Sequence, residues 1–202
     1  SIINSTAVIG YGLEDKGLDD TRIALANDAV SREAHRISQI VDRVRSYVKT
    51  TEKRHTACDL TQLAHRAYES FRHYSASKAD VELELENYLA INADDLEIEI
   101  MILNLLKNAA RAALKSKNAQ VILRPYRQGT KSVLEVCDNG PPLDEEGIVK
   151  LREALDGTSG GLGAEGLGLG LGIVRSIIDE HSATLQLEQL VPCGVCIRVL
   201  FD

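Results

Sequence analysis

The chain has 202 residues, of which 44% are hydrophobic and 26% charged, and its formal net charge is -7. This composition is typical of a folded globular protein and argues against a disordered chain. The acidic balance argues against nonspecific nucleic-acid binding, which needs clustered Lys and Arg, so we expect no nucleic-acid partner. No apolar run is long enough to cross a bilayer and no signal peptide is evident, so we expect a cytoplasmic location.

The first part of the chain predicts a long helix over residues 20–50. Its apolar residues recur at alternating spacings of four and three, the heptad pattern of a helix that packs on another helix. These residues are Val30, Ala34, Ile37, Val41, Val44 and Val48. Because a lone helix of this kind is marginal in water, we expect a helical hairpin or a dimer. Residues 1–13 are then the end of the preceding helix.

The rest of the chain predicts strands and helices in alternation. In order they are a strand at 55–60, a helix to 74, a strand at 81–86, a helix at 94–114, strands at 121–126 and 132–137, a helix at 144–155, a glycine-rich loop, a helix at 168–181, and strands at 184–190 and 195–201. The pattern predicts an α/β (α+β) fold, a two-layer sandwich with helices on one face of a mixed, mostly antiparallel sheet. We expect two domains, a partial helical hairpin over 1–52 and this sandwich over 53–202.

Four cysteines are present, Cys58, Cys137, Cys193 and Cys196. Three lie in apolar, strand-like runs, and we expect buried, reduced thiols. Cys193 and Cys196 have the spacing of a redox motif, but no helix start follows to lower a thiol pKa. The sequence leaves open whether this pair has a redox role.

A polar stripe lies on the helix predicted over 94–114. Asn104, Lys107, Asn108 and Arg111 follow one another at spacings of three, one and three, so they share one helix face, while Leu and Ala occupy the positions between. An amide oxygen is a hard, neutral Mg²⁺ ligand, and the two cations suit phosphate oxygens. The stripe indicates a metal–phosphate site, although the solvated face of an amphipathic helix has the same pattern.

Two glycine-containing segments follow. Asp138-Asn139-Gly140 comes directly after a predicted strand, where a carboxylate can accept a hydrogen bond from an exocyclic amine and a glycine lets a flat base approach. Alone, this segment is better explained as a turn. Residues 160–172 form a glycine-rich loop that leads into a helix, an arrangement that binds phosphates through backbone amides. The preceding segment is not a strand and no Gly-Lys-Ser/Thr follows, which excludes the Rossmann and Walker A motifs.

In this order and spacing, the three segments resemble the N, G1 and G2 boxes of the histidine-kinase branch of the GHKL ATP-binding superfamily, over roughly residues 55–202. The resemblance implies the GHKL-type sandwich, with ATP and Mg²⁺ as ligands. It implies a catalytic set of Asn104, Lys107, Asn108 and Arg111. Asn108 is the Mg²⁺ ligand in this set, Asn104 its companion one turn earlier, and the two cations are phosphate neighbours.

The resemblance also implies the nucleotide-binding residues. Asp138 binds the adenine amine and Gly140 lies beneath the ring, while Gly166, Gly168 and Gly170 line the phosphates. Ser182 and Ala183 stand where two glycines are common in the family, and its phenylalanine-containing box is not evident in residues 151–158.

The upstream helix resembles the second helix of the dimerisation and phosphotransfer hairpin of such kinases, which implies a homodimer. The family's phosphoacceptor is a histidine followed by an acidic residue, and none of the five histidines here fits. His35 precedes Arg36, which cannot act as a base, so it is a poor alternative acceptor. We therefore expect that the acceptor lies before Ser1 and that this fragment cannot phosphorylate itself. Any membrane attachment is expected only through missing N-terminal regions.

The function implied is that of a sensor histidine kinase core, which transfers the γ-phosphoryl group of ATP to a histidine for relay to a response-regulator receiver domain. Superfamily ATPases use a glutamate one helical turn before the metal asparagine to activate water, and here that position is Asn104. Asparagine cannot act as that base, which disfavours hydrolysis and makes a GHKL-type ATPase or chaperone-like module the weaker alternative. A dimerisation module with a degenerate, non-catalytic nucleotide pocket is the other.

Overall fold

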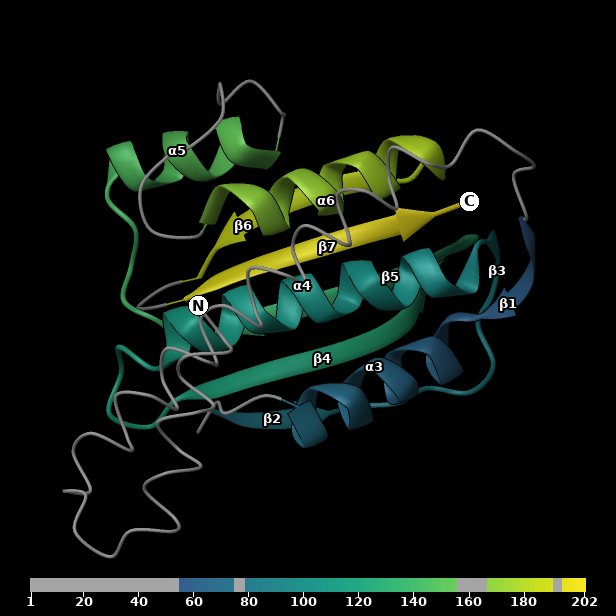
Figure 1. Ribbon diagram of the computed structural model, residues 1–202, viewed down its shortest axis with the longest axis horizontal. Helices are drawn as coiled ribbons and strands as arrows, with labels where there is room; N and C mark the ends of the chain where they lie inside the picture. Colours follow the sequence, from purple (N-terminus) through teal and green to yellow (C-terminus); the bar gives the residue numbers. More distant parts are fainter. Residues whose placement is uncertain (1–54, 75–78, 156–166, 191–193) are drawn as a thin grey trace, which may run out of the picture. The chain divides into compact units, whose positions relative to one another are not determined.

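The computed structural model describes residues 55–74, 79–155, 167–190 and 194–202 (Figure 1). The chain divides into two units, Ser1–Glu52 and Lys53–Asp202. The helical hairpin predicted for residues 1–52 lies outside the described residues. The account below concerns the second unit alone.

The main sheet of this unit has five strands in the order β2-β4-β5-β7-β6. Its strands are β2 (Asp80–Leu83), β4 (Gln120–Gln128), β5 (Lys131–Asp138), β6 (Thr184–Gln189) and β7 (Val195–Phe201). Only the β2–β4 pair is parallel, and the other three pairs are antiparallel. The β4–β5 hairpin turns at Gly129, whose φ of 62° favours glycine. The predicted mixed, mostly antiparallel sheet is confirmed.

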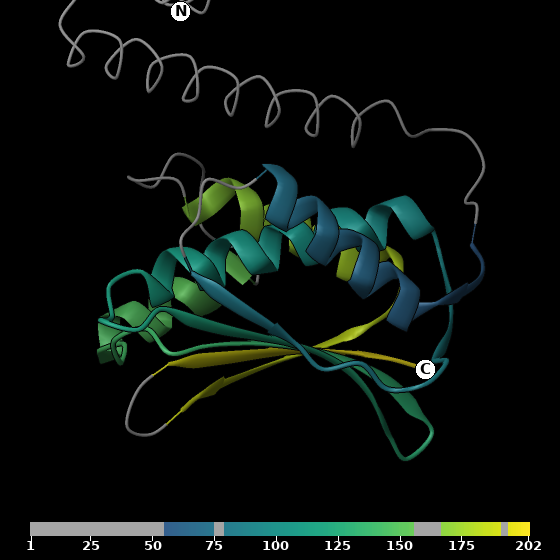
Figure 2. The same ribbon diagram turned by 90° about the horizontal axis from the view of Figure 1, so that it is seen from below.

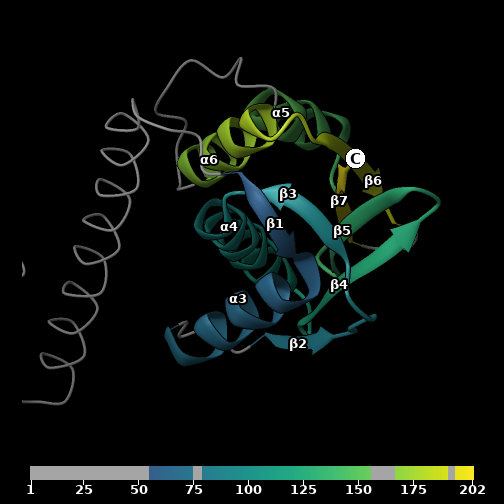
Figure 3. The same ribbon diagram turned by 90° about the vertical axis from the view of Figure 1, so that its right-hand side faces the viewer.

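Helices cover one face of this sheet, as seen edge-on in Figure 2. They are α3 (Leu60–Tyr74), α4 (Asp95–Ala113) and α6 (Leu167–Glu180), and α5 (Glu145–Leu155) packs beside α6. In the end-on view of Figure 3, α3, α4 and α6 lie on the same side of the strands. The predicted two-layer sandwich is therefore confirmed. Among the described helices, none is both long enough and apolar enough to span a membrane.

The core lies between α4 and the sheet. Alternate residues of β4, Val121 and Leu123, point inward and are almost fully buried, while Ile98, Ile102 and Leu105 of α4 are buried against them. β5 is the central strand, and Ser132 through Val136 are buried without interruption. Leu134 and Val136 belong to the core beneath the helices, whereas the buried Glu135 lies between them in the strand and faces the opposite side of the sheet.

A second, two-stranded sheet pairs β1 (Thr56–Asp59) with β3 (Ala90–Ala93). The sequence did not predict β3, because its four residues contain only one strongly β-forming side chain. The carboxylate of Asp59 accepts from the backbone N–H groups of Thr61 and Leu89, at 3.0 Å each. Asp59 thereby joins the start of α3 to the segment that leads into β3.

The end of α6 is a Schellman motif. The N–H of Ala183 donates to the carbonyl of Ile178 (3.0 Å), and the N–H of Ser182 donates to that of Asp179 (3.2 Å). Ser182 has a φ of 52°, the left-handed conformation that favours glycine. The sequence departure noted at Ser182 thus falls at a position of backbone strain.

The face of the sheet opposite the helices carries a buried ion cluster. Glu135 of β5 is only 2% exposed and bonds Arg124 of β4 and Arg198 of β7. These arginines also pair with Glu84 and Glu188, respectively. Hydrogen bonds from Arg198 to Glu135 and Glu188 raise the pKa of this arginine above its ordinary value.

Two cysteines form a disulfide on this same face. Cys137 of β5 and Cys196 of β7 are register partners, and their sulfurs are bonded. The prediction of reduced thiols is therefore wrong for this pair. It failed because β5 and β7 are not consecutive in the chain, so the sequence did not show that they are neighbours. Cys58 is a free thiol that donates to the carbonyl of Ala93, and Cys193 lies outside the described residues.

Candidate nucleotide-binding site

The predicted polar stripe lies on one side of α4. Asn104 and Asn108 are partly buried, whereas Lys107 and Arg111 are exposed. The helix begins at Asp94, whose carboxylate accepts from the backbone N–H of Glu97 (3.2 Å). The buried apolar face of α4 fixes its rotation against the sheet, so the polar stripe has a defined direction.

The two asparagines of the stripe face Gly170 in α6. The Asn104 side-chain amide donates to the carbonyl of Ile100 (2.8 Å), which leaves its oxygen available. A Cβ at Gly170 would lie 3.0 Å from Asn104 Oδ1 and 3.7 Å from Asn108 Nδ2. Glycine at this position therefore lets α6 approach the two amides closely.

Asn108 has an unsatisfied polar atom. Its Nδ2 is buried and has no hydrogen-bond partner in the part of the chain that the structure describes. A buried amide without a partner costs about 1–3 kcal/mol, so it is retained only where something offsets that cost. Rotation of the amide by half a turn presents its oxygen in the same place, so the position suits an amide ligand to a cation.

Asp138 and Gly140 form a tight loop at the end of β5. Asp138 Oδ1 accepts from the N–H of Gly140 (2.7 Å), and the carboxylate also accepts from the backbone of Val195. Burial raises the pKa of Asp138, and the two backbone hydrogen bonds oppose this shift without cancelling it. The carboxylate is thus held in a partly dry position with its orientation fixed.

Gly140 packs against the backbone of α4. A Cβ there would lie 2.9 Å from the carbonyl carbon and oxygen of Ala112, so no larger residue fits without a shift. Ala112 is one helical turn beyond Asn108, and this contact brings the Asp138 loop to the same part of α4 as the asparagines.

Asn139 has a structural role in this loop that the sequence did not reveal. Its side chain donates to the carbonyl of Asn118 (2.5 Å) and accepts from the N–H of Gln120 (2.9 Å). Its own carbonyl accepts from the hydroxyl of Ser116 (2.8 Å). Asn139 thus ties the loop to the connection between α4 and β4.

The three predicted segments therefore converge on the C-terminal half of α4. Gly170 lies beside Asn104 and Asn108, and Gly168 belongs to the first turn of α6. Gly166 lies outside the described residues. The amides, the exposed cations and the start of a glycine-rich helix together form an arrangement suited to a nucleotide phosphate chain.

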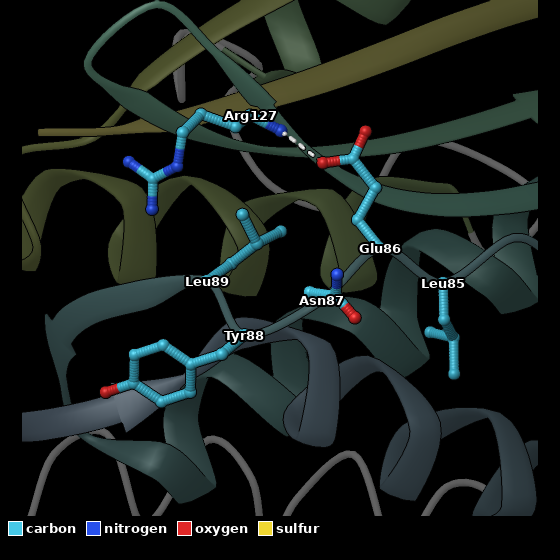
Figure 4. Close-up of a pocket in the computed structure, with 6 residues that line it drawn as sticks. All are labelled: Leu85, Glu86, Asn87, Tyr88, Leu89 and Arg127. Carbon is cyan, nitrogen blue, oxygen red and sulfur yellow. Dashed lines mark hydrogen bonds between the residues drawn. The ribbon is translucent and has the colours of Figure 1, made fainter.

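A pocket elsewhere contains none of the predicted site residues. It has a volume of about 360 Å³ and lies where the β2–β3 connection meets β4 (Figure 4). It is lined by Leu85, Glu86, Asn87, Tyr88, Leu89 and Arg127. The N–H of Arg127 donates to the Glu86 carboxylate (3.1 Å), which closes one side of it. It is separate from the site on α4.

The two-layer fold and the site on α4 define a nucleotide-binding domain of the α/β-sandwich class. The chain belongs to the histidine kinase-, DNA gyrase B- and HSP90-like ATPase family, whose model matches residues 93–202. This match includes every predicted site residue.

Curated relatives are bacterial sensor proteins. The C4-dicarboxylate transport sensor protein DctS of Rhodobacter capsulatus is 27% identical over 91% of this chain, and the match covers 28% of that protein. The sensor histidine kinase ZraS of Klebsiella oxytoca is 26% identical over 79% of this chain and 34% of its own length. The chain thus spans about a third or less of these relatives.

A solved structure of a histidine kinase catalytic domain has a similar fold. The catalytic domain of histidine kinase ThkA is 27% identical, with a TM-score of 0.59 over 73% of this chain and 95% of that one. The prediction of a GHKL-type, ATP-binding catalytic core of a sensor histidine kinase is confirmed.

Proposed function

We propose that this domain binds Mg²⁺-ATP on α4 and transfers the γ-phosphoryl group to a histidine of the same kinase, for relay to a response-regulator receiver domain. The observation that carries the proposal is the buried Nδ2 of Asn108, which has no hydrogen-bond partner among the described residues and lies beside Asn104 and Gly170. The nucleophile comes from the substrate histidine, so the domain itself supplies positioning and charge neutralisation.

Asp138 is proposed to recognise adenine. Its carboxylate accepts from the exocyclic amine, and its two backbone hydrogen bonds hold it in place beforehand. Gly140 is placed beneath the ring in this proposal, and its lack of a side chain lets the loop pack directly on the backbone of α4 at Ala112. GTP carries a carbonyl where ATP carries the amine, so a carboxylate here discriminates against it.

Magnesium is proposed to be held by the Asn108 amide oxygen and by phosphate oxygens. The ion would neutralise charge that develops on the phosphates during transfer. The residues fit this role, because Asn108 Nδ2 is buried with no partner among the described residues, and Asn104 bonds Ile100 through its side-chain nitrogen and not its oxygen.

The phosphate chain is proposed to lie at the start of α6. Gly166, Gly168 and Gly170 would line it with backbone amides, and the helix N-terminus favours its negative charge. Lys107 and Arg111 are exposed on the same stripe of α4 and would meet the terminal phosphates.

Phosphoryl transfer is favoured over ATP hydrolysis because α4 offers no carboxylate near the asparagines. Its acidic residues are Asp95, Glu97 and Glu99, all N-terminal to Asn104. Glu99 is the closest in sequence, and it pairs with Arg66 of α3 (2.5 Å). A water-activating base is therefore not provided by this helix.

The wider setting is proposed from the relatives. We infer that the chain is the cytoplasmic portion of a membrane-bound sensor, and that residues 1–52 belong to a dimerising, phosphotransfer hairpin. The support is the heptad pattern of residues 20–50 and the sensor proteins that this chain resembles.

Calorimetry of ATP and GTP binding, each with and without Mg²⁺, followed by a phosphate-release assay on the same sample, tests the proposal. We expect Mg²⁺-dependent, ATP-selective binding with almost no phosphate release. Steady release would instead favour an ATPase. Failure to bind ATP would leave only a non-catalytic dimerisation module.

A further inference from the structure

We propose that Cys137 and Cys196 form a reversible redox site that sets the affinity of the adenine-binding loop, with the disulfide as the tighter-binding state. Small-molecule disulfides, such as glutathione disulfide, are the class of oxidant. The effect on ATP rests on the proposed role of Asp138, but the redox chemistry of the pair does not.

The two cysteines end the ladder between β5 and β7. Paired residues run from Ser132 opposite Phe201 to Cys137 opposite Cys196, and no registered pair lies beyond. Their Cα atoms are 4.1 Å apart, and 59 residues separate them in the chain. The covalent bond therefore closes the end of the ladder where terminal pairs would otherwise open most easily.

The same end of the ladder holds Asp138. Asp138 follows Cys137 directly, and its carboxylate accepts from the backbone of Val195, which directly precedes Cys196. Gly194 packs on the Asp138 backbone so closely that a Cβ there would overlap the Asp138 carbonyl oxygen. One covalent bond thus spans the two strand ends that together orient the carboxylate.

Loss of the bond is expected to loosen this arrangement without unfolding the sheet. The remaining β5–β7 pairs include the buried Glu135–Arg198 ion pair, which holds the strands together two register pairs further in. Only the last rung and the Asp138 loop lose a covalent restraint. In the reduced protein, ATP binding would have to order the backbone of about one residue of the Asp138 loop. That entropy cost corresponds to an ATP affinity roughly tenfold lower than in the disulfide-bonded state.

The exchange chemistry assigns different roles to the two sulfurs. Cys137 retains some exposure, whereas Cys196 is fully buried. The Cys137 thiolate attacks one sulfur of the small disulfide and releases one small thiol. The Cys196 thiolate then attacks Cys137 in the mixed disulfide and releases the second thiol, so two protons leave the protein and two electrons pass to the oxidant.

A metal site is the weaker interpretation of the same cluster. Potential ligand atoms of Glu135, Cys137 and Cys196 lie within 4.8 Å of one another. However, Arg124 Nε bonds one Glu135 oxygen (3.0 Å) and Arg198 Nε bonds the other (2.5 Å). With both oxygens engaged by guanidinium groups, the carboxylate is not free to bind a cation.

The test uses the full chain in a Cys193→Ser background, equilibrated with reduced or oxidised glutathione. Peptide mass mapping reports the disulfide, and hydrogen exchange of the Asn139 and Gly140 amides reports the loop. Calorimetry reports ATP affinity. We expect a Cys137–Cys196 bond only in oxidised glutathione, faster loop exchange after reduction, and roughly tenfold weaker ATP binding in the reduced state.

Single variants sharpen the test. Cys196→Ser should trap glutathione on Cys137, and Cys137→Ser should not accumulate it. Both should hold the low-affinity state in either buffer, while Cys58→Ser should respond as the background does. Absence of the bond in oxidised glutathione, or equal loop exchange in both states, would overturn the proposal. Redox-dependent loop exchange without any ATP binding would overturn the nucleotide role alone.

Discussion

At the residue scale, the site depends on polar groups held partly out of water. Burial raises the pKa of Asp138, and hydrogen bonds from Gly140 and Val195 only partly compensate. Between the ordinary carboxyl pKa and this raised value, the folded protein binds more protons than the unfolded chain. The contribution of Asp138 to stability therefore declines as pH rises through that window.

The same shift predicts how nucleotide binding depends on pH. As pH falls through the raised pKa, Asp138 takes up a proton and becomes a weaker acceptor for the adenine amine. ATP affinity should then fall at a higher pH than an ordinary aspartate would give. Calorimetric titrations over this range should show the fall in the wild type, beyond the change seen in Asp138→Asn. Since ATP phosphates titrate equally in both, identical pH profiles would contradict the role of Asp138.

Motif spacing predicted Asn104, Asn108, Asp138 and Gly170 because each segment keeps its chemistry within a few consecutive residues. It did not predict that the start of β7 contributes to the site, through the backbone of Val195, which bonds Asp138, and through the bond from Cys196 to Cys137. Those depend on the register between β5 and β7, and non-consecutive strands leave no mark of their pairing in a single sequence.

At the element scale, two of the three glycines of α6, Gly170 and Gly172, have different surroundings. A Cβ at Gly170 would lie 3.0 Å from Asn104 Oδ1, whereas a Cβ at the exposed Gly172 would meet nothing within 4 Å. Gly170→Ala should lower ATP affinity about tenfold, because it displaces the Asn104 side chain at a cost of about 1 kcal/mol. Gly172→Ala should leave binding unchanged.

Both substitutions should also stabilise the fold, because alanine has a higher helix propensity than glycine. At an exposed position this gain is about 1 kcal/mol in the free energy of unfolding. Calorimetry and urea unfolding of the two variants separate the effects. Loss of binding in Gly172→Ala, or unchanged binding in Gly170→Ala, would show that close approach of α6 to the asparagines is not what the site requires.

The C-terminal cap of α6 offers a test of backbone strain. Ser182 has a φ of 52° in a Schellman motif. Ser182→Gly should stabilise the fold by about 0.5–1 kcal/mol, because the left-handed cost exceeds the entropy that glycine loses. Ser176→Gly, in the middle of the same helix and exposed, should destabilise it by about 0.5–1 kcal/mol. Urea unfolding decides, and a destabilised Ser182→Gly would contradict the strain argument.

Helices were the elements best predicted from the sequence. α4 keeps a helical apolar period over 19 residues and carries a recognisable cap at Asp94. β3 was missed because it is four residues long, and β2 ends at Leu83 although alternation continues to Glu86. Strand ends depend on whether a partner strand continues, which local pattern does not show.

At the scale of the whole molecule, the described site lies wholly within the second unit, Lys53–Asp202. A fragment of residues 53–202 should therefore fold alone. Its affinity for Mg²⁺-ATP should be within about twofold of that of the full chain, a difference in binding free energy well under the roughly 1.4 kcal/mol of a tenfold change. Circular dichroism melting and calorimetry of the two proteins provide the comparison. A fragment that folds but does not bind ATP would mean that residues 1–52 complete the site.

The most direct test of the central claim is calorimetric ATP binding to the wild type and to Asn108→Ala, with and without Mg²⁺, alongside urea unfolding of both. We predict at least a tenfold loss of affinity and loss of Mg²⁺ dependence in the variant, with stability changed by no more than about 1 kcal/mol. A folded Asn108→Ala variant with unchanged, Mg²⁺-dependent ATP affinity would contradict the assignment of this site.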